Sequence, residues 1–193
     1  MLGPRDIWNR IGGIGETPPP VIGRARGPLL VMGGAAGVWR DSAAVEPWDG
    51  ERMAVNDIGA HHAGVIRHWV SLHPEYFPGW RFYRDRHCLG EGQPYECHAS
   101  RDADGVDRVW RLNTGGSSGL LACMVGLMLG YEHIVLAGVP MDGGPHYFDP
   151  PTAKTDLGSA TLEAEWLWAR DQLFAGRVKS LSGRTRDWLG APP

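Results

Sequence analysis

Four short apolar runs, each ending in glycine or polar residues, constrain most strongly what this chain can fold into. They cover residues 28–32, 52–55, 65–72 and 133–138. Short, mainly apolar runs of this kind are typical of strands buried on both faces of a parallel sheet. Because ligands bind at the carboxyl ends of the strands in such sheets, the residues that follow each run are the first candidates for a functional site.

Helical segments separate and follow these runs. The segment 117–131 is apolar on all sides, which predicts a buried helix that ends at Gly130. An amphipathic helix is expected over 160–174, a short helix near 42–45, an edge strand near 178–181, and a last short helix capped by Ser182. This order predicts an α/β fold of the Rossmann-like type, with an open, mostly parallel sheet and helices on both faces.

A length of 193 residues suits one domain. We expect a Gly/Pro-rich arm over 1–27 and a single α/β nucleotide-binding domain over 28–193. Within that domain, 81–112 looks like an irregular or antiparallel β-rich insertion, with short strands at 81–83, 95–98 and 106–112. The long Pro/Gly loop 139–158 has the length of a lid or binding loop.

Charge and composition exclude several classes of protein. The net charge of −3 gives no basic surface for nucleic acid. The longest apolar run, 120–129, is half of the about 20 residues that a membrane span needs. No signal peptide is visible, and three cysteines give no disulfide framework, so a cytoplasmic location is expected.

Three candidate sites follow apolar runs or open a helix. The turn that begins at Gly33 and Gly34 lacks the spacing of a dinucleotide fingerprint or a P-loop, yet it allows backbone to approach a phosphate or ribose. Asn56 offers a donor and an acceptor to a base or ribose. Ser117 and Ser118 open the buried helix, where free N–H groups attract anions. The alternatives are a tight turn, a self-capping turn residue and an ordinary N-cap.

The long loop carries the candidate catalytic groups. Histidine is the residue type best suited to proton transfer at neutral pH, so His146 could serve as a general base, oriented by a carboxylate such as Asp142. His73 ends the third run and is expected to line the same site. The alternative for the loop is a solvated segment without catalytic function.

Two patterns suggest metals on first inspection. His87-Cys88 and Cys97-His98 would face each other across a hairpin, but adjacent residues point to opposite faces of a strand. Each face then receives two ligands, whereas structural zinc usually takes four, so no zinc is expected. The acidic stretch 102–107 does not have EF-hand spacing, and Asp104-Gly105 is typical of a hairpin turn.

The block 114–142 resembles a known family. Its glycine/serine turn, small apolar helix ending in Leu129-Gly130-Tyr131, and strand 133–139 are similar to a segment of the bacterial CMP-sialic-acid sialyltransferases and of the related 6-hydroxymethylpterin diphosphokinase-like domains. Gly33-Gly34, Asn56 and the tail 180–183 are similar in order, so the resemblance covers about 28–190.

This resemblance implies a Rossmann-like domain that holds a nucleotide or nucleotide sugar. By match, the binding residues are Gly33, Gly34, Asn56, Ser117 and Ser118, with His73 near a later polar contact. A mechanism like that of the sialyltransferases needs no metal, whereas one like that of the diphosphokinases uses Mg²⁺ with ATP.

The sequence also departs from the family pattern. The sialyltransferases carry a histidine base just before the penultimate helix, but 152–160 contains none, so His146 is a displaced substitute. Asp142 comes two residues later than its counterpart.

We therefore expect a nucleotide-dependent transferase, above all a sialyltransferase-like glycosyltransferase. The alternatives are a pterin diphosphokinase-like enzyme and a non-catalytic nucleotide- or ligand-binding module that has lost the base. A homo-oligomer is compatible with the sequence, since its nine tryptophans also favour interfaces.

Overall fold

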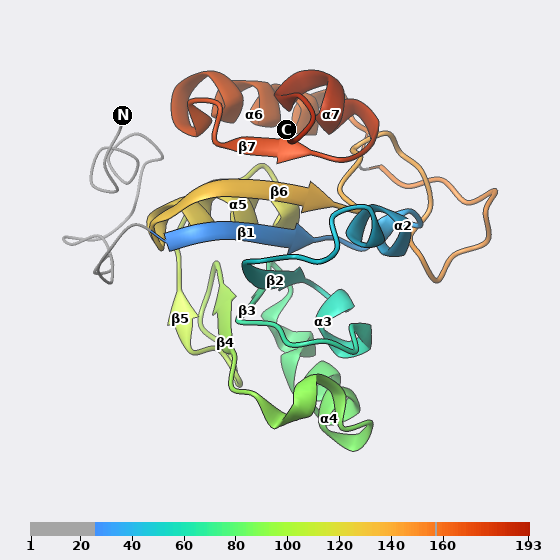
Figure 1. Cartoon of the computed structure of the whole chain (residues 1–193), viewed down its shortest axis with the longest axis vertical. Helices are drawn as coiled ribbons and strands as arrows, with labels where there is room; N and C mark the ends of the chain where they lie inside the picture. Colours follow the sequence, from blue (N-terminus) through green and yellow to red (C-terminus); the bar gives the residue numbers. More distant parts are fainter. Residues whose placement is uncertain (1–25, 157) are drawn as a thin grey trace.

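All strands of the described residues form one parallel sheet (Figure 1). The structure is a computed structural model that describes residues 26–156 and 158–193, so the predicted arm lies almost wholly outside it. The strands are β1 (Arg26–Met32), β2 (Glu51–Val55), β3 (His68–Ser71), β4 (Glu96–Ala99), β5 (Arg108–Val109), β6 (Tyr131–Ala137) and β7 (Val178–Ser180). The expected α/β class is confirmed, and the sheet is parallel at every pair.

The sheet order places the direction change of the chain at its centre. The order is β5-β4-β3-β2-β1-β6-β7. The chain moves outward from β1 to β5 and then returns to lay β6 on the other side of β1. A crevice forms at such a switch point, outside the carboxyl ends of the strands.

Helices cover both faces of the sheet. They are α2 (Val38–Ala43), α3 (Ile58–His61), α4 (Phe77–Arg86), α5 (Ser118–Met128), α6 (Ala160–Ala169) and α7 (Gly183–Leu189). Short helical turns occupy Pro74–Tyr76, Leu89–Gly92 and Arg170–Phe174. Side chains of α5 and α6 fill the core on one face, and side chains of α2, α3 and α4 fill it on the other.

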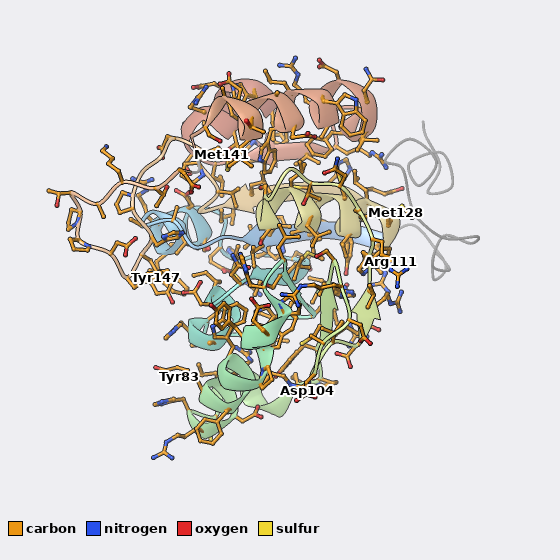
Figure 2. All side chains as sticks on the ribbon, turned by 180° about the vertical axis from the view of Figure 1, so that it is seen from behind. Tyr83, Asp104, Arg111, Met128, Met141 and Tyr147 are labelled. Atoms are coloured by element: carbon orange, nitrogen blue, oxygen red, sulfur yellow. The ribbon has the colours of Figure 1, made fainter. Side chains whose placement is uncertain are left out.

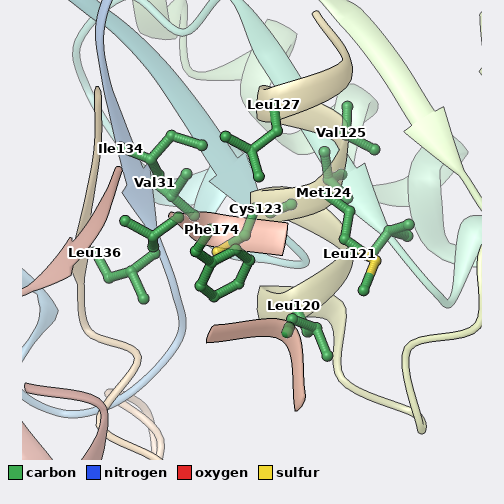
Figure 3. Close-up of a cluster of buried hydrophobic side chains, with 14 of the residues drawn as sticks. Val31, Leu120, Leu121, Cys123, Met124, Val125, Leu127, Ile134, Leu136 and Phe174 are labelled. Atoms are coloured by element: carbon green, nitrogen blue, oxygen red, sulfur yellow. The ribbon is translucent and has the colours of Figure 1, made fainter. Parts of the chain in front are cut away.

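Strand β1 supplies both cores because its side chains alternate. Leu29 and Val31 point to the α5 face, whereas Leu30 and Met32 point to the opposite face. Every residue of α5 is buried, as predicted for a helix that is apolar on all sides. Figure 3 shows its side chains gathered with those of Val31, Ile134, Leu136 and Phe174.

The predicted strand at 81–83 is wrong, because these residues lie within α4. Pro78 stands in the first turn of this helix, where proline is tolerated since its missing N–H has no helical partner. The rings of Phe77 and Trp80 pack on Trp69, with centroids 5.8 and 6.1 Å away. The local β preference of Arg81-Phe82-Tyr83 therefore yields to tertiary packing.

Of the two alternatives expected for 81–112, an irregular or an antiparallel insertion, the antiparallel one is also wrong. β4 and β5 extend the main sheet in parallel, with His98 opposite Arg108. Cys97 is buried in β4, whereas Cys88 is exposed in a left-handed turn after α4. The two cysteines do not face each other across a hairpin, so the hairpin argument about zinc ligands fails. Asp104-Gly105 does form a turn, but between parallel strands.

Smaller differences concern helix ends. The helix expected near 42–45 lies at α2, slightly earlier in the chain. Ser182 does stand at the N-cap of α7, but its hydroxyl donates to Asp41 instead of capping the helix.

No helix in the described part of the chain combines the length and apolarity that a membrane crossing requires.

Candidate functional site

A cleft of about 570 Å³ opens at the carboxyl ends of β1, β2, β3 and β6. Its walls come from the segments that follow these strands, the start of α5 and the long loop. Each site residue expected from the sequence lines this cleft: Gly33, Gly34, Asn56, His73, Ser117, Ser118, Asp142 and His146. The sheet topology therefore brings together residues that lie more than a hundred positions apart.

Glycines allow two strand ends to meet at the floor of the cleft. A Cβ on Gly33 would lie 2.6 Å from the carbonyl oxygen of Gly138, closer than real Cβ atoms come to other atoms. Gly138 itself has a positive φ of 65°, which favours glycine. The Gly33 N–H donates to the carbonyl of Ala137 at 2.8 Å. This turn keeps the ends of β1 and β6 close enough to share one ligand.

The side chain of Asn56 is oriented by a short hydrogen-bond chain. The backbone N–H of His73 donates to Ser71 Oγ at 2.8 Å, and Ser71 Oγ donates to Asn56 Oδ1 at 2.8 Å. Because Oδ1 is engaged, Nδ2 is the atom that remains to donate into the cleft. Asn56 has a φ of 55°, a conformation that asparagine tolerates better than most residues.

The start of α5 adds donors to the opposite part of the cleft lining. Ser117 is the N-cap residue, and its Oγ accepts from the backbone N–H of Leu120 at 3.1 Å. Ser118 Oγ accepts from the N–H of Leu72 at 3.3 Å, which ties the helix to the end of β3. Both hydroxyl protons can therefore point toward a ligand. The positive end of the helix favours an anion here.

His146 is paired with Asp149 and not with Asp142 as expected. Its Nδ1 lies 3.1 Å from Asp149 Oδ2, and its backbone N–H donates to the same oxygen at 3.1 Å. Since the carboxylate accepts from Nδ1–H, the neutral ring keeps a lone pair on Nε2. Asp142 lines the cleft but accepts from the backbone N–H of Gly144. Chemically, a histidine held by a carboxylate in this way is able to accept a proton at Nε2.

Backbone pairing holds the middle of the long loop against the glycine turn. Ala35 and His146 form an antiparallel bridge. The N–H of Ala36 donates to Pro145 at 3.0 Å, and that of Tyr147 donates to Gly34 at 2.9 Å. In Figure 1 this loop, drawn in orange, extends beyond the arrowheads of β1 and β6 near α2.

A side-chain contact adds to this attachment. The hydroxyl of Tyr147 donates to Asp57 Oδ2 at 2.7 Å. Burial raises the pKa of Tyr147, and the bond to Asp57 raises it further, so the phenol stays protonated at neutral pH. Asp57 follows β2, so this bond connects the loop to a second strand end.

The charges in the cleft are acidic. Asp57, Asp142 and Asp156 line it, whereas no lysine or arginine of the described residues does. An anionic ligand would therefore depend on N–H groups, hydroxyls and the end of α5.

A second polar cluster lies outside the cleft, around the first residues of β2, β3, β4 and β6, and sequence reasoning missed it. Trp110 Nε1 donates to His98 Nδ1 at 3.0 Å, and His98 Nε2 lies 2.9 Å from His68 Nδ1. His68 Nε2 lies 2.9 Å from the hydroxyl of Tyr131, which donates to Glu51. These residues are far apart in sequence, and only the strand register brings them together.

The cluster contains a triad with metal-ligand spacing. His68, Glu96 and His98 offer one atom each within 4.8 Å of one another. However, the indole N–H of Trp110 can only donate, so the proton of His98 stands on Nε2 and is donated to His68 Nδ1. His98 Nε2 then carries the proton and His68 Nδ1 accepts it, so neither of these two atoms has a lone pair free for a metal. The chain from Trp110 to Glu51 is therefore better described as a directed row of hydrogen bonds.

Comparisons with known proteins identify solved structures that share this fold. No family model matches the sequence, and no curated protein does either. A solved structure of the sialyltransferase CstII from Campylobacter jejuni with cytidine-5'-monophosphate superposes with a TM-score of 0.60 at 15% identity, covering 89% of this chain and 87% of that one. The fold is shared with these sialyltransferases.

Two further solved structures agree. One is CST-II in complex with a trisaccharide acceptor and CMP, with a TM-score of 0.60, 14% identity and 86% coverage of each chain. The other is the monofunctional α-2,3-sialyltransferase Cst-I from Campylobacter jejuni, with a TM-score of 0.58 at 9% identity, covering 90% of this chain and 82% of that one. At such identities the likeness establishes the architecture alone.

Proposed function

We propose that the protein is a glycosyltransferase that binds a nucleotide-activated sugar in the cleft, with a nucleoside monophosphate as leaving group and His146 as general base. The observation that carries this proposal is the pairing of His146 with Asp149 in a cleft that also contains the donor-rich start of α5. The shared fold with enzymes solved in complex with CMP supports it.

The proposed reaction uses groups already placed in the cleft. His146 Nε2 takes the proton of an acceptor hydroxyl, whose oxygen forms the new bond to the anomeric carbon. The bond from that carbon to the phosphate oxygen breaks, and the phosphate keeps the electron pair. Asn56 Nδ2, the hydroxyls of Ser117 and Ser118, and the N–H groups at the start of α5 would stabilise this leaving group.

A monophosphate donor fits the charges better than a diphosphate. A diphosphate ligand usually needs Mg²⁺ to offset its charge. Asp57, Asp142 and Asp156 line the cleft, and no lysine or arginine of the described residues does, so the lining favours the donor that carries less negative charge.

A ligand panel and a pair of histidine variants test the proposal. CMP, UMP, GDP and ATP are compared by thermal shift, and a ligand at 100 times its Kd should stabilise the fold by about 2.7 kcal/mol. Transfer is then measured with the sugar conjugate of the nucleotide that binds. His146→Ala should keep the shift and lose about 10²–10⁴ in rate.

The matched control is His133→Ala, an exposed histidine on β6 that lines no part of the cleft. It should behave as wild type. The absence of a shift with every nucleotide would refute nucleotide binding. A shift without turnover would instead favour the non-catalytic binding module.

A further inference from the structure

A continuous row of aromatic and imidazole rings leads away from the cleft. His146 stacks on Phe148, and both line the cleft. Phe148 contacts Tyr147, which contacts His61 at 5.6 Å between centroids. His61 contacts Tyr83 at 4.7 Å, and Tyr83 contacts His87 at 4.3 Å. Trp39 joins the row at Tyr147, and His62 stacks on Trp39.

The rings of this aromatic row come from separate elements and share one side of the molecule. They belong to α2, the segment around α3, α4 and the long loop. Figure 2 shows Tyr147 and Tyr83 on the same side of the chain. Phe148, Trp39 and Tyr83 are 61%, 41% and 39% exposed, so solvent reaches much of their ring surface. Exposed apolar surface grouped in this way marks a contact site.

We propose that the aromatic row is a binding surface for a neutral oligosaccharide, which extends the acceptor site of the proposed transferase beyond a single sugar. This inference rests on the proposed function for its biological meaning, but saccharide binding can be measured without transfer. The row begins at the proposed base, where the acceptor hydroxyl must arrive.

The side chains of the aromatic row favour a saccharide over other kinds of partner. The exposed large hydrophobic side chains of the described residues are aromatic, with Val65 as the exception. A pyranose offers a flat C–H face for such rings and hydroxyls that can pair with imidazole nitrogens and phenols. Aliphatic side chains, which a lipid tail or a protein core would bury against, are nearly missing. Single-stranded nucleic acid also stacks on rings, but it needs a basic groove, and the adjoining cleft carries three aspartates.

The test measures binding of neutral gluco- and galacto-oligosaccharides, from disaccharide to hexasaccharide, by saturation-transfer NMR and calorimetry. Affinity should increase with chain length, because a longer chain covers more rings. Tyr83→Ala should reduce affinity for the longer chains by about tenfold, the cost of one lost stacking contact of about 1.4 kcal/mol.

Phe82→Ala is the matched control. Phe82 is next to Tyr83 and is 66% exposed, but it makes no ring contact within the described part of the chain. Its removal should leave oligosaccharide affinity unchanged. Equal losses in the two variants, or no oligosaccharide binding by a protein that binds CMP, would overturn the inference.

The outcomes also separate this inference from the proposed function. Length-dependent binding that requires Tyr83 in a protein that ignores every nucleotide would support the saccharide surface and refute the transferase. Sedimentation adds one more outcome against the inference: a dimer that Tyr83→Ala dissociates would assign the row to a second copy of the chain.

Discussion

At the scale of single residues, the candidate base owes its orientation to one carboxylate. Asp149 accepts from both the ring and the backbone N–H of His146, so it fixes the tautomer as well as the ring position. Without it the ring can turn, and the proton can move to Nε2. Asp149 is a positioning residue because it acts through His146.

Asp149→Asn is therefore expected to lower kcat while the KM for the donor stays nearly constant. The loss should not exceed the about 10²–10⁴ that the base itself contributes. The split between kcat and KM is the decisive readout, because a merely structural loss would weaken donor binding as well. Asp142→Asn, which alters a carboxylate that contacts Gly144 instead, should leave kcat in place.

At the scale of elements, α2 ties the end of β6 to the start of α7 through a buried aspartate. Asp41, 4% exposed, accepts at Oδ2 from the backbone N–H of Gly138 at 3.1 Å and from the hydroxyl of Ser182. One helix thereby connects the end of β6 with the start of α7.

Asp41→Ala should destabilise the fold by about 1–3 kcal/mol for each donor left without a partner. Urea unfolding measures this loss. Ser42→Ala, at the next position of the same helix, is the control: the Ser42 hydroxyl is buried without a partner, so its removal should be neutral or stabilising. A similar loss in both variants would contradict the role given to Asp41.

Element positions also explain what the sequence could predict. Strand ends are visible as apolar runs that stop at glycine or polar residues, and a parallel sheet gathers such ends at one edge, so the cleft lining was predictable. Asp149 was not, because its contact depends on the path of an irregular loop. The helix α4 was missed since its packing on Trp69 outweighs the β preference of residues 81–83.

At the scale of the whole molecule, buried histidines link stability to pH. Burial lowers the pKa of His68 to about 3, and nearby Arg26, Arg67 and Arg108 lower it further. Burial likewise lowers the pKa of His98 and of His62, the latter to about 4. The row from Trp110 to Glu51 thus holds neutral imidazoles across the amino ends of the strands.

The sign of the effect follows from proton binding. Above the unfolded pKa of about 6.5 these histidines are neutral in both states, so stability is complete. Below this pKa the unfolded chain binds protons that the folded chain does not bind. The free energy of unfolding therefore falls as the pH falls, by up to about 1.4 kcal/mol per pH unit for each histidine. The loss continues toward the folded pKa values.

Urea unfolding between about pH 7 and pH 5 should therefore show a steep loss of stability, in a window where most carboxylates do not yet titrate. His68→Gln should flatten this slope, whereas His133→Gln, at an exposed position, should not. Parallel slopes for all three proteins would show that His68 does not carry the effect.

The bridge between Ala35 and His146 has a consequence for how this protein can diversify. Because the backbone bridge and the Tyr147–Asp57 bond anchor the loop just before residue 148, and Thr155 bonds the far side of the loop to Gly143 and Gly144, the tip 150–154 has no such bond to the rest of the described chain. Residues can then be inserted, deleted or exchanged within this tip while His146 keeps its position. Substrate preference and the position of the candidate base would thereby be uncoupled.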